Sequence, residues 1–124
     1  MGLIALDHVN ILTPNLERMT AWYCDVLGLV KGDRPQFRIP GAWLYIGDTP
    51  AVHLVDVADA PANEGPAIEH FAIRATGLSA FKARLDAHGV AYTVDPIPAI
   101  EMVQVNVRDC DGNHIHVDFP AAEA

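Results

Sequence analysis

Four histidines occupy matching places in two halves of the chain, and neutral imidazole is a common ligand of divalent transition metals. His8 and His70 lie 62 residues apart in the similar stretches Leu-Asp-His-Val-Asn-Ile and Ile-Glu-His-Phe-Ala-Ile. His53 and His116 lie 63 residues apart, each inside an apolar run. Offsets that agree to within one residue indicate an internal repeat. The sequence therefore predicts a doubled unit with two histidines in each copy.

The elements that carry these histidines follow the same order in both halves. In the first half, hydrophobic periodicity predicts a strand at 5–12 and then a helix, which is capped by Thr13, has Pro14 at its first position and ends at Gly28. A weakly marked strand follows the helix, and two clearer strands are predicted at 41–47 and 51–57. In the second half it predicts a strand at 68–75, a helix at 78–88 ended by Gly89, a short strand near 91–95 broken by Pro96 and Pro98, and strands at 101–108 and 114–119 around an Asp-Gly hairpin.

These elements predict an α+β fold of eight strands and two helices. The order in each half is βαβββ, with module one at 1–57, module two at 67–120 and a loop-like linker at 58–66. A length of 124 residues fits one domain, residues 1–124, in which the two modules form a cupped mixed sheet around a shared cleft.

Strand parity places the histidines on one face of each sheet. The residues beside them are mostly apolar, as in Val52-His53-Leu54 and Ile115-His116-Val117, and neighbours along a strand point to opposite faces. If both sheets line one cleft, His8, His53, His70 and His116 converge and bind a divalent metal ion. The alternative is that each histidine is an ordinary core or surface residue. We interpret His114 as pocket lining and His88 as a solvated helix end.

Composition excludes several classes of function. The net charge is −8 and lysine and arginine do not cluster, which argues against nucleic acid as a partner. No apolar run reaches the length of a membrane span, so a cytoplasmic location is expected. Cys24 and Cys110 form no metal or disulfide motif and are expected to be free thiols. An anionic substrate would need a local positive centre, which a bound metal ion supplies.

The chain resembles the glyoxalase/bleomycin-resistance/extradiol-dioxygenase superfamily, also called the vicinal oxygen chelate superfamily. The motifs that carry the resemblance are the stretch at 6–11, Ala-Trp-Tyr-Cys-Asp-Val-Leu-Gly-Leu at 21–29, Glu-His-Phe-Ala-Ile at 69–73 and Asp-Cys-Asp-Gly-Asn-His-Ile-His at 109–116. The resemblance implies paired βαβββ modules, a homodimer, and metal ligands at His8, His53, His70 and His116. Because this superfamily uses one scaffold for many reactions, the resemblance is more specific for fold than for activity.

Histidines at 53 and 116 depart from relatives of the glyoxalase I type, which carry glutamate at both matching positions. An all-imidazole set leaves the charge of the ion uncompensated and removes the carboxylate that would act as the base. Asp118, on the same face as His116, and Glu101, at the start of a neighbouring strand, are candidate replacement bases. The metal is predicted to be divalent Zn, Ni, Co, Mn or Fe.

The predicted function is Lewis-acid chemistry of the lyase or isomerase type on a small oxygenated substrate. Two alternatives stay open: an extradiol-type dioxygenase, in which Asp118 or Glu69 completes a set of two histidines and one carboxylate, and a metal-free drug-binding protein of the bleomycin-resistance type. Candidate substrate contacts are Trp43 and Tyr45 on one strand face, Gln104 and Asn106 on another, and Arg38 or Arg74 as a partner for a carboxylate.

Overall fold

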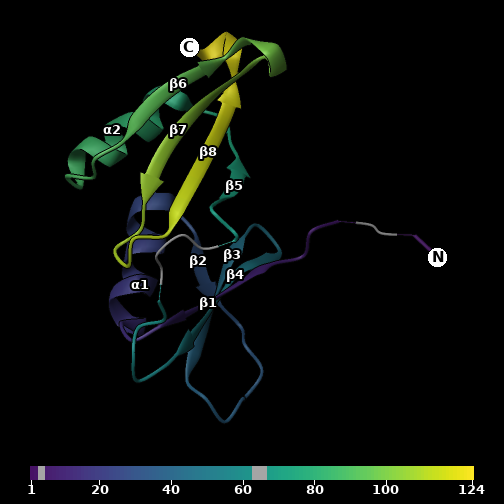
Figure 1. Ribbon diagram of the computed structural model, residues 1–124, viewed down its shortest axis with the longest axis vertical. Coiled ribbons are helices and arrows are strands. Elements are labelled where there is room, and N and C mark those ends of the chain that lie inside the picture. The colour runs from purple at the N-terminus through teal and green to yellow at the C-terminus, as the bar shows by residue number, and fades with distance from the viewer. Residues whose placement is uncertain (3–4, 63–66) are drawn as a thin grey trace. The chain divides into compact units, whose positions relative to one another are not determined.

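The computed structural model describes residues 1–2, 5–62 and 67–124. It divides into two compact units, Met1–Ala62 and Asn63–Ala124, and each is described by itself. Each contains a four-stranded mixed sheet and one principal helix, in the order βαβββ (Figure 1). The predicted α+β class and the two-module βαβββ architecture are confirmed.

Unit 1 has the strand order β1-β4-β3-β2. Its elements are β1 (Val9–Thr13), α1 (Leu16–Trp22), a π-helical turn η1 (Tyr23–Leu27), β2 (Val30–Gly32), β3 (Gly41–Ile46) and β4 (Thr49–Asp56). Strand β1 runs parallel to β4, and the other pairs are antiparallel. The helical stretch ends at Gly28, whose φ of 80° is a left-handed conformation that glycine adopts easily.

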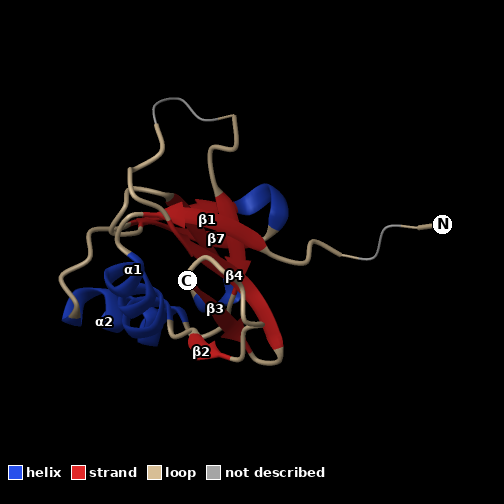
Figure 2. Cartoon of the chain, turned by 90° about the horizontal axis from the view of Figure 1, so that it is seen from below, coloured by secondary structure: helices blue, strands red, loops and turns tan. Residues whose placement is uncertain are grey.

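Unit 2 repeats this topology with the strand order β5-β8-β7-β6. Its elements are β5 (Phe71–Arg74), α2 (Leu78–Ala87), β6 (Thr93–Ile97), the 3₁₀ turn η2 (Pro98–Ile100), β7 (Met102–Arg108), β8 (His114–Pro120) and the 3₁₀ turn η3 (Ala121–Glu123). Strand β5 runs parallel to β8, which matches the β1–β4 pairing of unit 1. Figure 2 distinguishes the helices and strands of both units by colour.

In each unit one face of the sheet is apolar and packs on the helix, which leaves the other face for polar side chains. In unit 1, α1 packs on β3 and β4, and Met19 and Leu44 are fully buried there. In unit 2, the Phe81 ring of α2 lies 5.5 Å from the Phe119 ring of β8. Burial in β7 and β8 alternates strictly between residues, so their buried positions form one face and His114 and His116 belong to the other.

Two strands begin later than the sequence predicts, and both differences affect a histidine. Strand β1 begins at Val9 and β5 at Phe71, so His8 and His70 directly precede their strands. The parallel ladder of β1 begins at the Val9–Val52 pair, and Pro50, which lacks an N–H, lies just before that segment of β4. The ladder of β5 begins where β8 leaves its hairpin turn.

Two further predictions are corrected by the structure. Thr13 is the last residue of β1, and its buried side chain accepts a hydrogen bond from the Asn15 N–H at 3.0 Å, so the helix begins only at Leu16. Pro96 does not break its strand but lies inside β6. A proline is tolerated there because β6 is an edge strand and needs only one hydrogen-bonded neighbour.

Candidate functional site

The two predicted histidines of unit 1 form a stacked pair. The centroids of the His8 and His53 rings lie 3.8 Å apart at an interplanar angle of 11°. The Trp43 ring continues the stack, 4.2 Å from His53 at 12°. This contact follows from the ladder, in which Trp43 is the cross-strand partner of His53.

Unit 2 repeats the pair and adds a third histidine. The rings of His70 and His116 lie 4.0 Å apart at 14°. The His114 ring is 5.4 Å from His70 and 4.8 Å from His116. One ligand nitrogen from each of these three residues lies within 4.8 Å of the others, a spacing at which the three residues could hold one metal ion. His114 is thus a third candidate ligand, although the sequence indicated only pocket lining.

A carboxylate directly precedes the first histidine of each unit and binds its Nδ1 atom. Asp7 Oδ2 lies 2.6 Å from His8 Nδ1, and Glu69 Oε2 makes the equivalent contact with His70 Nδ1. A hydrogen bond from Nδ1–H to a carboxylate leaves Nε2 with its lone pair, which is the arrangement of many metal-binding histidines. The sequence analysis considered Glu69 only as a carboxylate ligand of a dioxygenase and gave Asp7 no role, although both acids stand one residue before a repeated histidine.

The second histidine of each unit is more enclosed and has a lowered pKa. In unit 1, His53 Nε2 donates to the Pro50 carbonyl oxygen at 2.9 Å, which leaves Nδ1 as the acceptor nitrogen. Burial, and then the neighbouring His8 ring, lowers the pKa of His53. Burial, and then the rings of His70 and His114, likewise lowers the pKa of His116. Both rings are therefore neutral near pH 7, which is the form that binds metal ions.

Glu69 connects two of the histidines of unit 2. Its second oxygen, Oε1, lies 2.8 Å from His114 Nδ1. Hydrogen bonds from His70 and then His114 lower the pKa of the Glu69 carboxyl to about 2. His114 Nε2 lies 3.0 Å from Asn106 Oδ1, so both nitrogens of this ring face oxygen atoms. Binding a metal ion through His114 would require one of these two contacts to be given up.

The hairpin between β7 and β8 sets the position of His114 and His116. The Asp109 carboxylate is buried and accepts the backbone N–H groups of Asp111 and Asn113, each at 2.9 Å. Gly112 in the turn has a φ of 89°. The predicted Asp-Gly hairpin is confirmed, and it leads directly into the strand that carries both histidines.

Several predicted substrate and base residues lie on this histidine face of unit 2. Asn106 is the cross-strand partner of His116, and Gln104 and Arg74 are both partners of Asp118. The Asp118 Oδ1 atom is buried and has no hydrogen-bond partner among the described residues. Asn106 Nδ2 also donates to Asp95 Oδ2 at 2.8 Å, which extends the network to β6.

Two predicted residues are not brought to the histidines of their own unit. Glu101 follows η2 with a left-handed φ of 54° and lies five residues along the chain from Asn106, or about 17 Å at the usual rise of a strand. Tyr45 packs its ring over Gly32 and donates its hydroxyl to the Asp33 carbonyl oxygen at 2.6 Å. Its contacts are those of a residue that holds the following loop.

The donor set fits a divalent transition metal. In each unit two imidazoles lie in contact, and at least one is held by a carboxylate that leaves its Nε2 atom free. These rings come from rigid strands or from residues directly before them, which keeps the ligands in place before an ion arrives. The ions preferred by imidazole nitrogen are zinc, copper, iron and nickel.

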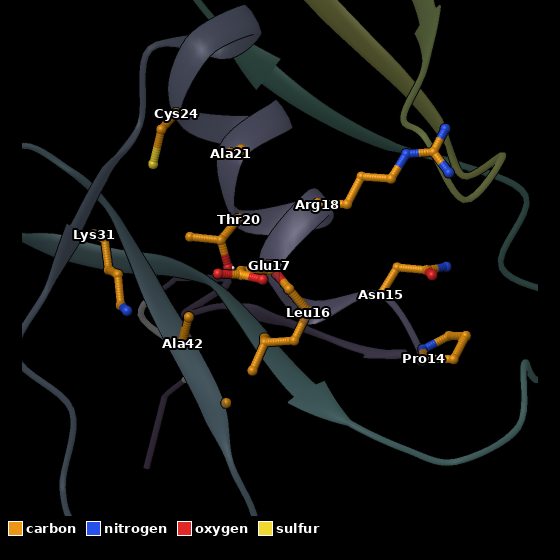
Figure 3. A pocket seen from close by; sticks show the side chains of 11 residues that line it. Pro14, Asn15, Leu16, Glu17, Arg18, Thr20, Ala21, Cys24, Lys31 and Ala42 are labelled. Carbon is orange, nitrogen blue, oxygen red and sulfur yellow. Dashed lines mark hydrogen bonds between the residues drawn. The ribbon is translucent and has the colours of Figure 1, made fainter.

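Two hollows in the described part of unit 1 differ in their lining residues. The hollow of about 630 Å³ is lined by His8 and His53, together with Trp43 and two arginines. The other, of about 810 Å³, lies between α1 and the strands and is lined by residues such as Glu17, Lys31 and the free thiol of Cys24 (Figure 3). Among the described residues that line it there is no histidine.

Comparison with protein families decides what kind of protein this is. Residues 7–105 match the family described as the Glyoxalase/Bleomycin resistance protein/Dioxygenase superfamily. The chain belongs to this superfamily. The match begins one residue before the first histidine and includes three of the four predicted ligands. The family that the motifs indicated is thus confirmed.

Solved structures of the superfamily share the fold over nearly the whole chain. A glyoxalase family protein from Bacillus anthracis has a TM-score of 0.81 and 21% identity, with 97% of this chain and 98% of that chain covered. A lactoylglutathione lyase from Agrobacterium tumefaciens has a TM-score of 0.67 and 20% identity, with 95% of each chain covered. TnmS3, an antibiotic-binding protein from Streptomyces sp. CB03234, has a TM-score of 0.69 and 22% identity, with 97% and 98% covered. No curated protein matches the chain.

At these identities the likeness concerns the fold alone. The names of the superfamily members include an enzyme and a binding protein, so the fold does not decide between these two functions. In the part of the chain that the structure describes, no helix is long and apolar enough to cross a membrane.

Proposed function

We propose that this superfamily member is a divalent-metal-dependent enzyme that acts on a small oxygenated substrate by lyase- or isomerase-type chemistry. The observation that carries the proposal is the repeated pair of stacked imidazoles, each with a carboxylate on the Nδ1 atom of its first ring. If these histidines had only a structural role, the same arrangement would not be expected in both units. The proposed metal ligands are His8, His53, His70 and His116.

A divalent ion bound by an imidazole pair of this kind would polarise a carbonyl or hydroxyl oxygen of the substrate. The chain itself supplies orientation and proton transfer. Asp7 and Glu69 fix the first ring of each pair, and the network of Asn106 and His114 fixes the polar face of unit 2. Asp118 is the proposed base, because one of its oxygens is buried without a hydrogen-bond partner in the described residues and it lies two residues from His116.

The dioxygenase alternative has less support from these contacts. It requires two histidines and one free carboxylate around an iron ion. Both oxygens of Glu69 are already bound to the Nδ1 atoms of His70 and His114. Asp118 is then the remaining candidate for the carboxylate ligand.

The histidine chemistry predicts a defined pH range for the metal. Burial lowers the pKa of His53 and His116 below the ordinary value of 6.5, so the unfolded chain takes up these protons more readily than the folded chain. The free energy of unfolding of the chelated protein should therefore decrease as the pH falls below about 6.5. Because protons compete for the same nitrogens, the metal-loaded protein should lose its ion below about pH 6.

Elemental analysis after dialysis at a series of pH values, combined with urea unfolding of the chelated protein, checks both expectations. A metal content that is unchanged down to about pH 4, well below the histidine range, would show that imidazole nitrogens are not the ligands.

We also propose that the protein is a homodimer. Within unit 1, β1 is an edge strand of its sheet, and it carries Leu12 with 45% of its surface exposed. Strand β2, at the other edge, exposes 65% of Val30. Open edges with apolar side chains are usually covered by other chains or by charges. Light scattering at micromolar concentration should give twice the chain mass of 13.4 kDa, and a strictly monomeric mass would contradict the proposal.

A further inference from the structure

The histidine faces of the two units differ in chemistry at equivalent positions. Trp43 pairs with His53 across the ladder of unit 1, whereas Asn106 pairs with His116 at the matching place in unit 2. The same contrast holds two residues on either side of the strand histidine, where unit 1 has Ala51 and Val55 and unit 2 has His114 and Asp118. The two units share histidines at equivalent positions but differ in the residues around them. This difference indicates that the two units have different roles.

The face in unit 1 is hollowed, and its lining is largely apolar. The pocket of about 630 Å³ has the size of many small-molecule sites. Apolar groups line it from the strands and from the segment between β2 and β3: Phe37, Ile39, Trp43, Pro50 and Val55. Phe37 and Ile39 are 56% and 55% exposed, a large apolar surface for a segment of an acidic chain. Burying this surface against a ligand would be favourable.

The apolar groups include two aromatic rings that offer flat contact surfaces. Trp43 is held on one side by stacking on His53, so its orientation is fixed. The Phe37 ring lies 6.4 Å from it at an angle of 46°. Aromatic groups favour offset-stacked or edge-to-face neighbours, and such contacts add to simple burial. These rings favour a flat aromatic ligand.

Two arginines give the same pocket a positive end. Arg34 and Arg38 line it, and Asp7, the acidic residue among the described ones that line it, is bound to His8. The guanidinium of Arg34 is fixed by a bond from Nη2 to the Ile39 carbonyl oxygen at 3.0 Å and by the Phe37 ring, 4.9 Å from Cζ. Its Nε atom is buried and has no partner among the described residues. An unpaired buried donor is costly, and an acceptor brought by a ligand would relieve that cost.

Gly41 gives Arg34 the space for this position. A Cβ atom at residue 41 would lie 2.6 Å from Arg34 Nη2 and 2.3 Å from the Leu54 carbonyl oxygen. The guanidinium therefore lies directly against the backbone of β3, two residues from Trp43. A fixed guanidinium beside a fixed aromatic ring matches the carboxylate and the ring of one ligand.

We propose that the pocket of unit 1 binds flat aromatic carboxylic acids, with the ring against Trp43 and Phe37 and the carboxylate at Arg34 and Arg38. This inference rests on the proposed function in that it names the substrate class of the same site.

The test is calorimetric titration of 2-naphthoate into the full chain, first freed of metal by chelation. The neutral analogue 2-naphthalenemethanol and the non-aromatic cyclohexanecarboxylate serve as comparison ligands. We expect 2-naphthoate to bind at least 10-fold more tightly than either. Arg34→Gln and Phe37→Leu should each weaken its binding, about 10-fold or more for Arg34→Gln because a charged hydrogen bond is lost. The exposed Arg84→Gln on α2 is the matched control and should bind like the parent.

Circular dichroism of each variant separates loss of binding from loss of fold; Phe37 is more than half exposed, so its replacement should leave the fold intact. Equal binding of the acid and the alcohol, or unchanged binding by Arg34→Gln, would overturn the inference. Because the titration uses chelated protein, a failure of this inference can be distinguished from a failure of the proposed function. If naphthoate binds but no metal does, the substrate class stands and the pocket belongs to a binding protein. If metal binds but naphthoate does not, only this inference fails.

Discussion

Replacing Glu69 by glutamine should lower the affinity for a divalent metal about 10- to 100-fold, the usual effect of losing a group that orients a metal ligand. Glu69 binds the Nδ1 atoms of both His70 and His114, and its charge favours protons on those atoms. A glutamine offers one acceptor oxygen and no charge, so at most one of the two rings keeps its partner. The change in folding stability should be small, because the Glu69 side chain is 64% exposed.

Competition with a fluorescent zinc chelator at pH 7.5 measures this effect. Asp7→Asn is the equivalent change in unit 1 and should have a smaller effect, because Asp7 holds only His8. Glu17→Gln, in the first turn of α1 and outside the histidine face, is the control and should leave the affinity unchanged. Equal affinities of Glu69→Gln and the control would show that this carboxylate does not orient a metal ligand.

The repeat made much of the fold predictable. Periodicity and two nearly equal offsets predicted eight strands, two helices and their order, because a pattern that occurs twice arises by chance far less often than one that occurs once. The pairing of His53 with His8 and of His116 with His70 followed from strand parity, and the structure places each pair in contact. Alternation along a strand is a local property, so the sequence records it directly.

Other features depend on contacts that local patterns do not record. Glu101 is the first residue of the predicted strand at 101–108, but β7 begins at Met102 and its register places Glu101 far along the sheet from His116. The role of Glu69 depends on His114, 45 residues away. The segment that carries Arg34 and Phe37 contains glycine and prolines and has no periodicity, so its place over the pocket could not be predicted.

Replacing His116 by glutamate should keep stoichiometric metal, because carboxylate oxygen also binds divalent cations and glutamate is the residue of glyoxalase I-type relatives at this position. With metal bound, the melting temperature should stay near that of the parent. Without metal, the new carboxylate would stand where the charges of Asp118 and Glu69 already act on residue 116, and like charges repel. We expect this arrangement to cost about 2 kcal/mol, or roughly 8 °C in melting temperature for a domain of this size.

The central claim, that imidazole pairs hold a divalent ion, is tested most directly by thermal melts of the parent and of His116→Glu, each with and without chelator. Loss of an ion that binds only the folded state lowers stability. We therefore predict nearly equal melting temperatures for the two metal-loaded proteins, a lower value for the chelated parent, and the lowest value for chelated His116→Glu. A parent whose melting temperature does not respond to chelator, together with a variant that is strongly destabilised under both conditions, would contradict the claim.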